Sequence, residues 1–417
     1  MKMEIGGEWD LVLRRTQKRK FLEICEDSRF SMEELNQDLL ERVLSWLPTS
    51  TFLRLTSVCK KWKSMADSAT FRLACSQVPF RDPWFFMVDS DPQLSQHPVV
   101  FDSAEKNWKK LNPLPLVQPK KNQESCSNYI PVAASGGLIC FHSTNGDFTV
   151  SNPVTGSTRL IPALNSISQL PILAISMTAN SERFKLVLIL GHIPNLLFKM
   201  YNSSTDQWEE EIPLNQKINS YGEAEKDDEH LQYFLTSGNV VSADMQRSPF
   251  KQYSSALTVE NGEEILYFLS SSGTVVSCNL THKLFFEYPR LLPVFSEYSI
   301  DIVECGGQMY VVLLSEFFES ASIRVWKWDQ NMHAWQQIAA MPPASSHKFY
   351  GKKVDINCSG AGDEMLVCLN SAEVCSYVMC NLVRNEWTEL PHCYTDDDKS
   401  REFVCAFSFE PRIEADI

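Results

Sequence analysis

Long apolar runs are missing from this sequence of 417 residues. The longest apolar stretches, such as LVLIL at 186–190, have the length of a strand and are too short to cross a bilayer. The first residues, MKMEIGGEWDLVLRR, carry too much charge for the apolar region of a signal peptide. Because 44% of the residues are hydrophobic, the sequence predicts a soluble, globular protein with room for more than one domain.

Positive charge is also scarce. The chain has 38 Lys and Arg residues against 52 Asp and Glu residues, a formal net charge of −14. This excess opposes binding to nucleic acid backbones and to anionic membranes, so we expect neither as a partner. One basic cluster, RRTQKRK at 14–20, is either a nuclear import signal or a solvated arm. We expect a cytoplasmic or nuclear protein, or one found in both compartments.

Paired cysteines and catalytic motifs are absent as well. The 13 cysteines are odd in number and lie singly between Cys25 and Cys405, which favours reduced thiols packed as small apolar side chains. No HExxH, CxxC, GxSxG or GxxxxGK[ST] motif occurs. Cys375 and Cys380 have a spacing that places them on opposite faces of a strand, which favours core packing over a metal site. We therefore expect no catalytic, metal or cofactor site.

Helical periodicity is present between Met32 and Ala66. The apolar residues of its first part fall on one stripe of a helix, at Leu39, Leu40, Val43, Leu44 and Leu47. Charged neighbours such as Glu41 should turn outward. Pro48 should end this helix, and Thr49, Ser50 and Thr51 are suitable caps for a second helix, which carries Phe52 through Trp62. A third short helix should include Phe71 and Leu73.

So short a helical unit is marginal on its own and needs a partner surface. Its pattern resembles the F-box, the helical module that docks on the Skp1 adaptor of cullin-based ubiquitin ligases. The resemblance rests on Leu35, Leu39, Leu40, Val43, Leu47, Pro48, Leu53, Leu55, Val58, Cys59 and Trp62. It implies that these residues bind a Skp1-like adaptor, with Leu47, Pro48 and Leu53 on the docking surface. Where the family has Leu-Pro this chain has Leu35-Asn36, and Asn is itself a good helix cap. The alternative is an ordinary three-helix hairpin buried against the rest of the chain.

The remaining chain repeats. An Asn or Asp residue (Asx) recurs at intervals of 50, 50, 77, 50 and 52 residues, at Asp102, Asn152, Asn202, Asn279, Asp329 and Asn381. Six positions later stand Trp108, Thr158, Trp208, Phe285, Trp335 and Trp387. A proline follows in every unit, at Pro113, Pro162, Pro213, Pro289, Pro342 and Pro391. We expect the Asx side chain to start a hairpin turn, the aromatic residue to begin the return strand and the proline to end it. The fixed place of the tryptophans indicates packing, not a ligand cage.

Two further apolar stretches precede most turns, which gives four strands in about fifty residues. This period is typical of a β-propeller blade of the kelch type, and we expect six blades. The first unit has only three strands, PWFFMV, HPVVF and WKKL, whereas FVCAFSF at 403–409 is an extra strand. Pairing the two would close the ring and remove two exposed edges. An insertion of about 27 residues, which includes YGEAEKDDEH at 221–230, should form a charged, flexible excursion.

The predicted organisation is a basic, flexible segment at 1–30, an all-α module at 31–76 and an all-β propeller at 80–417. Together the modules resemble the plant-type F-box/kelch-repeat family, although within the predicted propeller Gly-Gly pairs occur only at Gly136-Gly137 and Gly306-Gly307. The resemblance implies a non-catalytic substrate receptor of an SCF ubiquitin ligase, which binds the Skp1-like adaptor, cullin through it, and an unknown target protein. A kelch scaffold that acts by binding alone is the alternative, and an enzyme is a distant third.

Overall fold

The computed structural model describes residues 36–58, 60–91, 97–115, 129–164, 170–180, 183–217, 233–236, 239–242, 251–270, 273–291, 298–317, 319–395 and 399–417. The chain divides into two compact units, Met1–Val78 and Pro79–Ile417. The segments RRTQKRK and YGEAEKDDEH, together with Leu35 and Cys59, lie outside the described residues. No helix in the described part of the chain has the length and hydropathy needed to span a membrane.

The first unit is helical. Its helices are α2 (Gln37–Ser45), α3 (Thr49–Thr56), α4 (Lys60–Met65) and α5 (Ala69–Ser76). Asn36 caps α2, because its side chain accepts a hydrogen bond from the Asp38 amide, and Ser68 caps α5 in the same way through the Phe71 amide. The rings of Phe52 and Phe71 lie 4.7 Å apart at the centre of the unit.

Two expectations about these helices are wrong. The second helix ends at Thr56, and α4 begins only at Lys60, so the apolar residues predicted for one helix belong to two. The N-cap of α3 is Pro48, which has no side-chain donor or acceptor, while Thr49 already lies inside the helix. The fixed φ of proline suits the start of a helix without a hydrogen-bonding cap.

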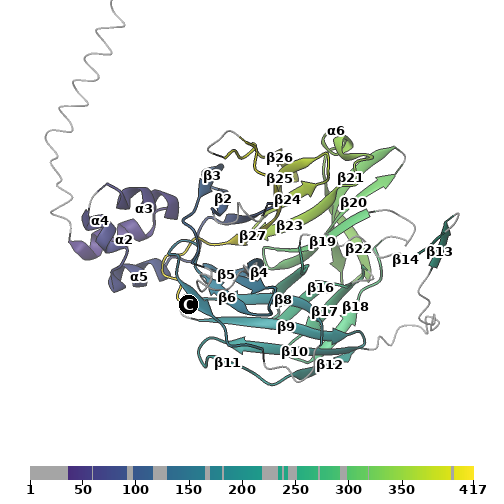
Figure 1. Cartoon of the computed structure of the whole chain (residues 1–417), viewed down its shortest axis with the longest axis horizontal. Coiled ribbons are helices and arrows are strands. Elements are labelled where there is room, and N and C mark those ends of the chain that lie inside the picture. Colours follow the sequence, from purple (N-terminus) through teal and green to yellow (C-terminus); the bar gives the residue numbers. More distant parts are fainter. Residues whose placement is uncertain are drawn as a thin grey trace, which may run out of the picture. The chain divides into compact units, whose positions relative to one another are not determined.

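The second unit is almost entirely antiparallel sheet (Figure 1). One sheet holds β4 (Tyr129–Ser135), β5 (Leu138–Ser143), β6 (Phe148–Ser151) and β7 (Thr158–Leu160). Another holds β19 (Tyr298–Cys305), β20 (Gln308–Phe317), β21 (Ser320–Asp329) and β22 (Ala334–Ala340). A third holds β23 (Asp355–Ala361), β24 (Glu364–Asn370), β25 (Cys375–Asn381) and β26 (Glu386–Glu389). Between the last two sheets lie α6 (Pro343–Ser346) and a short 3-10 helix, His347–Phe349.

The sheet that joins the two ends of this unit has the order β27-β1-β2-β3. Its strands are β1 (Trp84–Asp89), β2 (Val99–Asp102), β3 (Asn107–Lys110) and β27 (Phe403–Phe409). Strand β27 pairs with β1 in antiparallel register, from Trp84 opposite Phe409 to Asp89 opposite Phe403. The predicted pairing of the C-terminal strand with the first repeat is therefore present.

One sheet combines two repeats that we expected to form separate sheets. It has nine strands and contains the third and fourth repeats, with β12 and β18 paired in parallel between them. Its strands are β8 (Ile172–Ala179), β9 (Phe184–His192), β10 (Asn195–Asn202), β11 (Gln207–Trp208), β12 (Ile212–Gln216), β15 (Ser255–Glu260), β16 (Glu263–Leu269), β17 (Val275–Asn279) and β18 (Leu284–Glu287). Pro213 lies inside β12, opposite Leu197, so the proline does not end pairing here. A separate hairpin is formed by β13 (Tyr233–Thr236) and β14 (Asn239–Ser242).

Six strands form sheet edges that contact one another in a closed ring. The order of contact is β4, β8, β15, β19, β23, β27 and again β4. We call these the edge strands. Apolar side chains fill the space between consecutive sheets, as in the cluster that joins Ile323 and Val325 of β21 to Val367 of β24. The inner strands of these sheets are therefore covered on both faces, which explains the nearly continuous burial along β5 and β24, whereas outer strands such as β26 are mostly exposed.

Candidate functional site

Helix α2 divides its apolar residues between two environments. Leu40 and Leu44 are buried, with 1% and 3% of their surfaces exposed. Leu39 and Val43 are 54% and 60% exposed, and Trp46 directly after the helix is 62% exposed. Positions 39, 43 and 46 follow the spacing of one helix face. We call these three side chains the α2 apolar face. Exposed apolar side chains grouped in this way mark an interaction site.

The other predicted adaptor-binding residues follow this face in the sequence. Pro48 and Val58 are exposed. The remaining described ones are half-buried: Leu47, Leu53, Leu55 and Trp62. Sequence reasoning missed Trp46, although its spacing from Leu39 and Val43 would have indicated it. Residues 36–78 also carry six basic and three acidic side chains, the opposite balance to the whole chain, which favours an acidic partner surface.

Glu41, predicted to face solvent, is instead 3% exposed. Its carboxylate accepts hydrogen bonds from the Gln37 amide nitrogen at 3.0 Å and from the Ser68 hydroxyl at 3.4 Å. Since Ser68 is the cap of α5, this carboxylate connects α2 with the start of α5. The single apolar stripe used for the prediction could not reveal that a second helix covers the neighbouring face.

In the second unit, the six Asx side chains all lie at hairpin turns. Each accepts a hydrogen bond from a backbone amide two or three residues further on; for Asp102 the donors are Ala104 and Glu105, both at 3.0 Å. The same contact is made by Asn152, Asn202, Asn279, Asp329 and Asn381. Four residues after each Asx, the backbone has a positive φ, at Lys106, Gly156, Asp206, Lys283, His333 and Asn385. Sequence reasoning missed this last position because five different residue types occupy it.

Three of the repeat tryptophans bind the neighbouring repeat. The indole nitrogen of Trp208 donates to the carbonyl of Pro162 at 2.8 Å, and that of Trp335 donates to Pro289 at 2.8 Å. Trp108 donates to Pro391 at 2.9 Å and so connects the first repeat with the last. Trp387 differs, since its nitrogen donates to Asn385 in its own turn. The repeat therefore contains a hydrogen bond between sheets that its sequence spacing alone does not show.

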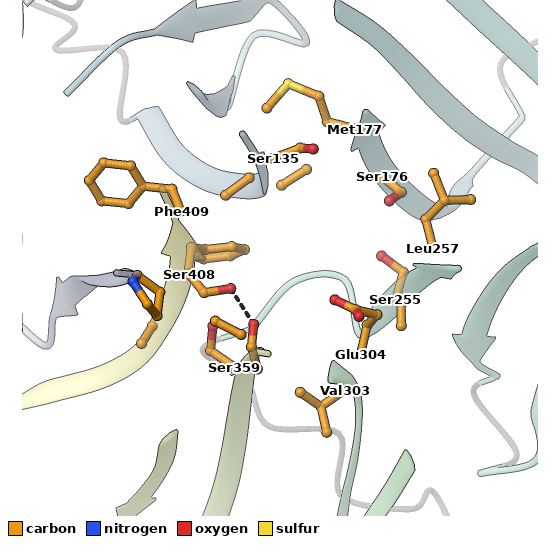
Figure 2. Close-up of a pocket in the computed structure, with 18 of the residues that line it drawn as sticks. Ser135, Ser176, Met177, Ser255, Leu257, Val303, Glu304, Ser359, Ser408 and Phe409 are labelled. Atoms are coloured by element: carbon orange, nitrogen blue, oxygen red, sulfur yellow. Dashed lines mark hydrogen bonds between the residues drawn. The ribbon is translucent and has the colours of Figure 1, made fainter. Parts of the chain in front are cut away.

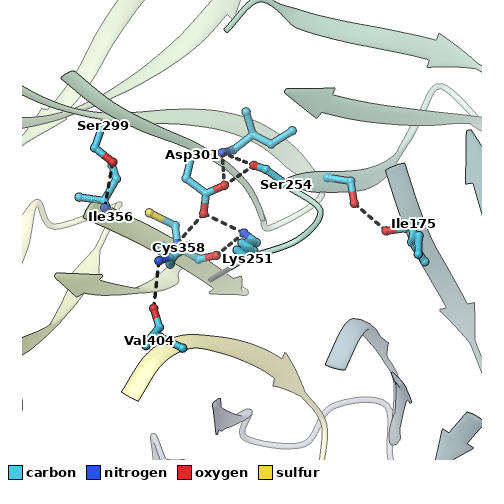
Figure 3. A network of polar contacts seen from close by, with 11 residues as sticks. Ile175, Lys251, Ser254, Ser299, Asp301, Ile356, Cys358 and Val404 are labelled. Carbon is cyan, nitrogen blue, oxygen red and sulfur yellow. Dashed lines mark hydrogen bonds and ion pairs between the residues drawn. The ribbon is translucent and has the colours of Figure 1, made fainter. Parts of the chain in front are cut away.

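A charged pair lies buried among the edge strands (Figure 3). The ammonium group of Lys251 is 2.8 Å from the carboxylate of Asp301 and 3.0 Å from the carbonyl oxygen of Cys358. Asp301 also accepts hydrogen bonds from the Ser254 hydroxyl and from the Cys358 amide. Burial disfavours the charge on Lys251, but Asp301 outweighs this effect and the pKa of Lys251 is raised. Residues before β15, on β19 and on β23 are joined by this network.

The described cysteines are not joined in disulfides, and all but Cys375 are buried. Cys375 and Cys380 both lie on β25, where Cys380 contributes to the cluster toward β21 and Cys375 packs against a different cluster that includes Phe403. Burial raises the pKa of the Cys380 thiol to about 12. Within the described ranges, no group of three or more His, Cys, Asp or Glu side chains has the geometry of a metal site.

Comparisons with known proteins identify the helical unit. The F-box domain model matches residues 32–73. F-box only protein 13 of Arabidopsis thaliana is 50% identical over 96% of this chain and 90% of its own length. F-box only protein 6 of the same plant is 28% identical over 95% of this chain and 78% of its own length. An F-box/kelch-repeat protein of Arabidopsis thaliana is 34% identical, but over only 32% of this chain and 30% of its own. The chain belongs to the F-box protein family.

Proposed function

We propose that this protein is the substrate receptor of an SCF-type ubiquitin ligase. The α2 apolar face and the residues around Pro48 bind a Skp1-like adaptor and, through it, cullin. The β-sheet unit binds a target protein, and the receptor supplies proximity instead of chemistry, since it holds a target lysine near the charged ubiquitin carrier. The observation that carries the proposal is the exposure of Leu39 and Val43 beside the buried Leu40 and Leu44 within an F-box domain.

We further propose that the β-sheet unit is a six-bladed propeller of the kelch type. Two observations support this proposal: the closed ring of six edge strands and the six Asx turns at intervals near fifty residues. In this interpretation the nine-stranded sheet consists of two blades whose outer strands, β12 and β18, have joined.

The test is capture of a purified Skp1-type adaptor by the intact chain and by a Leu39→Arg, Val43→Arg variant. Loss of a central interface side chain costs about 2 kcal/mol or more of binding free energy. We therefore expect the affinity for the adaptor to fall by a factor of roughly 30 or more. Both side chains are largely exposed, so the variant should fold, which a thermal melt verifies. Val383→Arg is the matched control, because Val383 is 75% exposed in the second unit and should not affect capture.

Two outcomes would contradict the receptor function. One is equal capture of the adaptor by the intact chain and the double variant, which would show that the α2 apolar face is not part of the interface. The other is failure of both folded proteins to capture the adaptor, which would favour a scaffold that acts by binding alone.

A further inference from the structure

A cavity of about 440 Å³ opens among the edge strands (Figure 2). Its volume lies in the range of ligand-binding pockets. Each of the six edge strands contributes at least one polar side chain to its lining: Ser135 of β4, Ser176 and Thr178 of β8, Ser255 of β15, Glu304 of β19, Ser359 of β23 and Ser408 of β27. Hydroxyl groups from five of these strands and the Glu304 carboxylate therefore surround the same space.

The hydrogen bonds of these hydroxyl groups determine what they can offer a ligand. The Ser255 hydroxyl donates its hydrogen to the carbonyl of Ile175 at 2.6 Å, and the Ser408 hydroxyl donates to the carbonyl of Gly360 at 2.5 Å. A hydroxyl group has one hydrogen and two lone pairs, so both oxygens can only accept further hydrogen bonds. Together with the carboxylate, they make the cavity rich in acceptors.

Glu304 gives this cavity a negative group. Its carboxylate accepts a hydrogen bond from the Gly307 amide at 2.6 Å, and it has no ion-pair partner within the part of the chain that the structure describes. Burial raises the pKa of Glu304, and the hydrogen bond from the Gly307 amide offsets this effect only in part. An incoming cation would compensate the negative charge.

The other charged groups of the lining already have partners. Lys251 is paired with Asp301, and Glu410 accepts a hydrogen bond from Arg412 at 2.8 Å. Arg81 also interacts with another residue of the chain. Glu304 is thus the charged group with the most to gain from a ligand.

The strands that carry these groups are held at close range. A side chain at Gly360 of β23 would collide with the carbonyl oxygen of Glu304 and the sulfur of Cys305 on β19. Close contact at a glycine fixes the separation of the two strands. The position of the Glu304 backbone is therefore set before any ligand arrives.

Apolar side chains complete the lining, among them Met177, Leu257, Val303 and Phe409 (Figure 2). Acceptors combined with an apolar wall match a cation at the end of a hydrocarbon stem. We propose that this cavity binds the guanidinium or ammonium group of an arginine or lysine side chain on a target polypeptide. The inference rests on the receptor function proposed above only for the source of the peptide, since binding to the cavity requires no adaptor.

The experiment is calorimetric titration of the full chain with the acetylated, amidated peptide Gly-Ser-Arg-Ser-Gly and with its lysine and citrulline counterparts. Citrulline keeps the shape of arginine but has no charge. We expect the arginine and lysine peptides to bind at least tenfold more tightly than the citrulline peptide. Glu304→Gln should remove this difference, whereas Glu373→Gln, at an exposed position outside the cavity, should preserve it.

Equal affinity for the arginine and citrulline peptides would overturn the proposal, and this comparison holds even if Glu304→Gln does not fold. Binding of ethylguanidinium as tight as that of the arginine peptide would assign the cavity to a small cation and would overturn the polypeptide as occupant. The Leu39→Arg, Val43→Arg variant should keep its affinity for the peptide. A failure of adaptor capture is therefore distinguishable from a failure of cation binding.

Discussion

At the scale of single residues, the buried pair Lys251 and Asp301 joins three parts of the ring of edge strands. Asp301 lies within YSIDIV, an otherwise mostly apolar strand sequence, and this isolated charge was the available signal. Its partner could not be inferred, because two residues 50 positions apart in the chain share no local periodicity that brings them together. Buried charges are stable only when paired, so each of the two residues depends on the other.

We predict that Asp301→Asn lowers the free energy of unfolding by roughly 3–5 kcal/mol, because it leaves the buried Lys251 without its counter-charge. Denaturant unfolding followed by tryptophan fluorescence measures the change. Glu386→Gln is the control, since its ion pair with Arg384 is solvent-exposed at 3.9 Å and should contribute less than about 0.5 kcal/mol. A similar small loss for both variants would show that the buried pair has no special role.

Other residues of the candidate sites differ in how far the sequence revealed them. The periodicity of α2 places Leu39 and Leu40 on one stripe and does not separate the exposed Leu39 from the buried Leu40, but the apolar face itself could be recognised. The serines of the cavity could not, because polar residues at alternate positions of a strand have the same pattern whether they face solvent or an enclosed space. Glu304 has the same ambiguity, which only the ring of strands resolves.

At the scale of secondary-structure elements, the repeat predicts turns better than it predicts sheets. An Asx residue acts through its own nearby backbone, so its role is visible in the sequence. The parallel pairing of β12 with β18 depends on two strands that are distant in the chain, and no local signal specifies it. The bonds between tryptophan and proline are of the same kind, since each joins two different repeats.

We predict that Trp335→Phe lowers stability by roughly 1–2 kcal/mol, because it removes the hydrogen bond to Pro289 between two repeats and part of the ring contact with Tyr288. Trp387→Phe provides the comparison, since this substitution removes a hydrogen bond within a single turn. Trp387→Phe should therefore lower the stability by less than Trp335→Phe. Thermal unfolding of both variants measures the difference, and a larger loss for Trp387→Phe would contradict a role of the tryptophans between sheets.

At the scale of the whole molecule, β27 determines whether the ring of edge strands closes. We predict that a chain ending at Pro391 does not unfold cooperatively, because β1 and the neighbouring edge strands lose their partner. A chain ending at Phe409 keeps β27 and loses only the contacts of the last residues, such as those from Asn152 to Arg412 and Ala415. It should melt cooperatively at a lower temperature than the full chain. A soluble, cooperatively melting product from the shorter chain would contradict the prediction.

The pairing of β1 with β27 also has a consequence for synthesis on the ribosome. The two strands are separated by residues 90–402, so the growing chain presents β1 without β27 until almost all of the second unit has emerged. The helical unit precedes it and has no such long-range requirement, because its core forms between helices that are close in sequence. A nascent chain can therefore display the α2 apolar face while its sheet unit still has an open edge at β1.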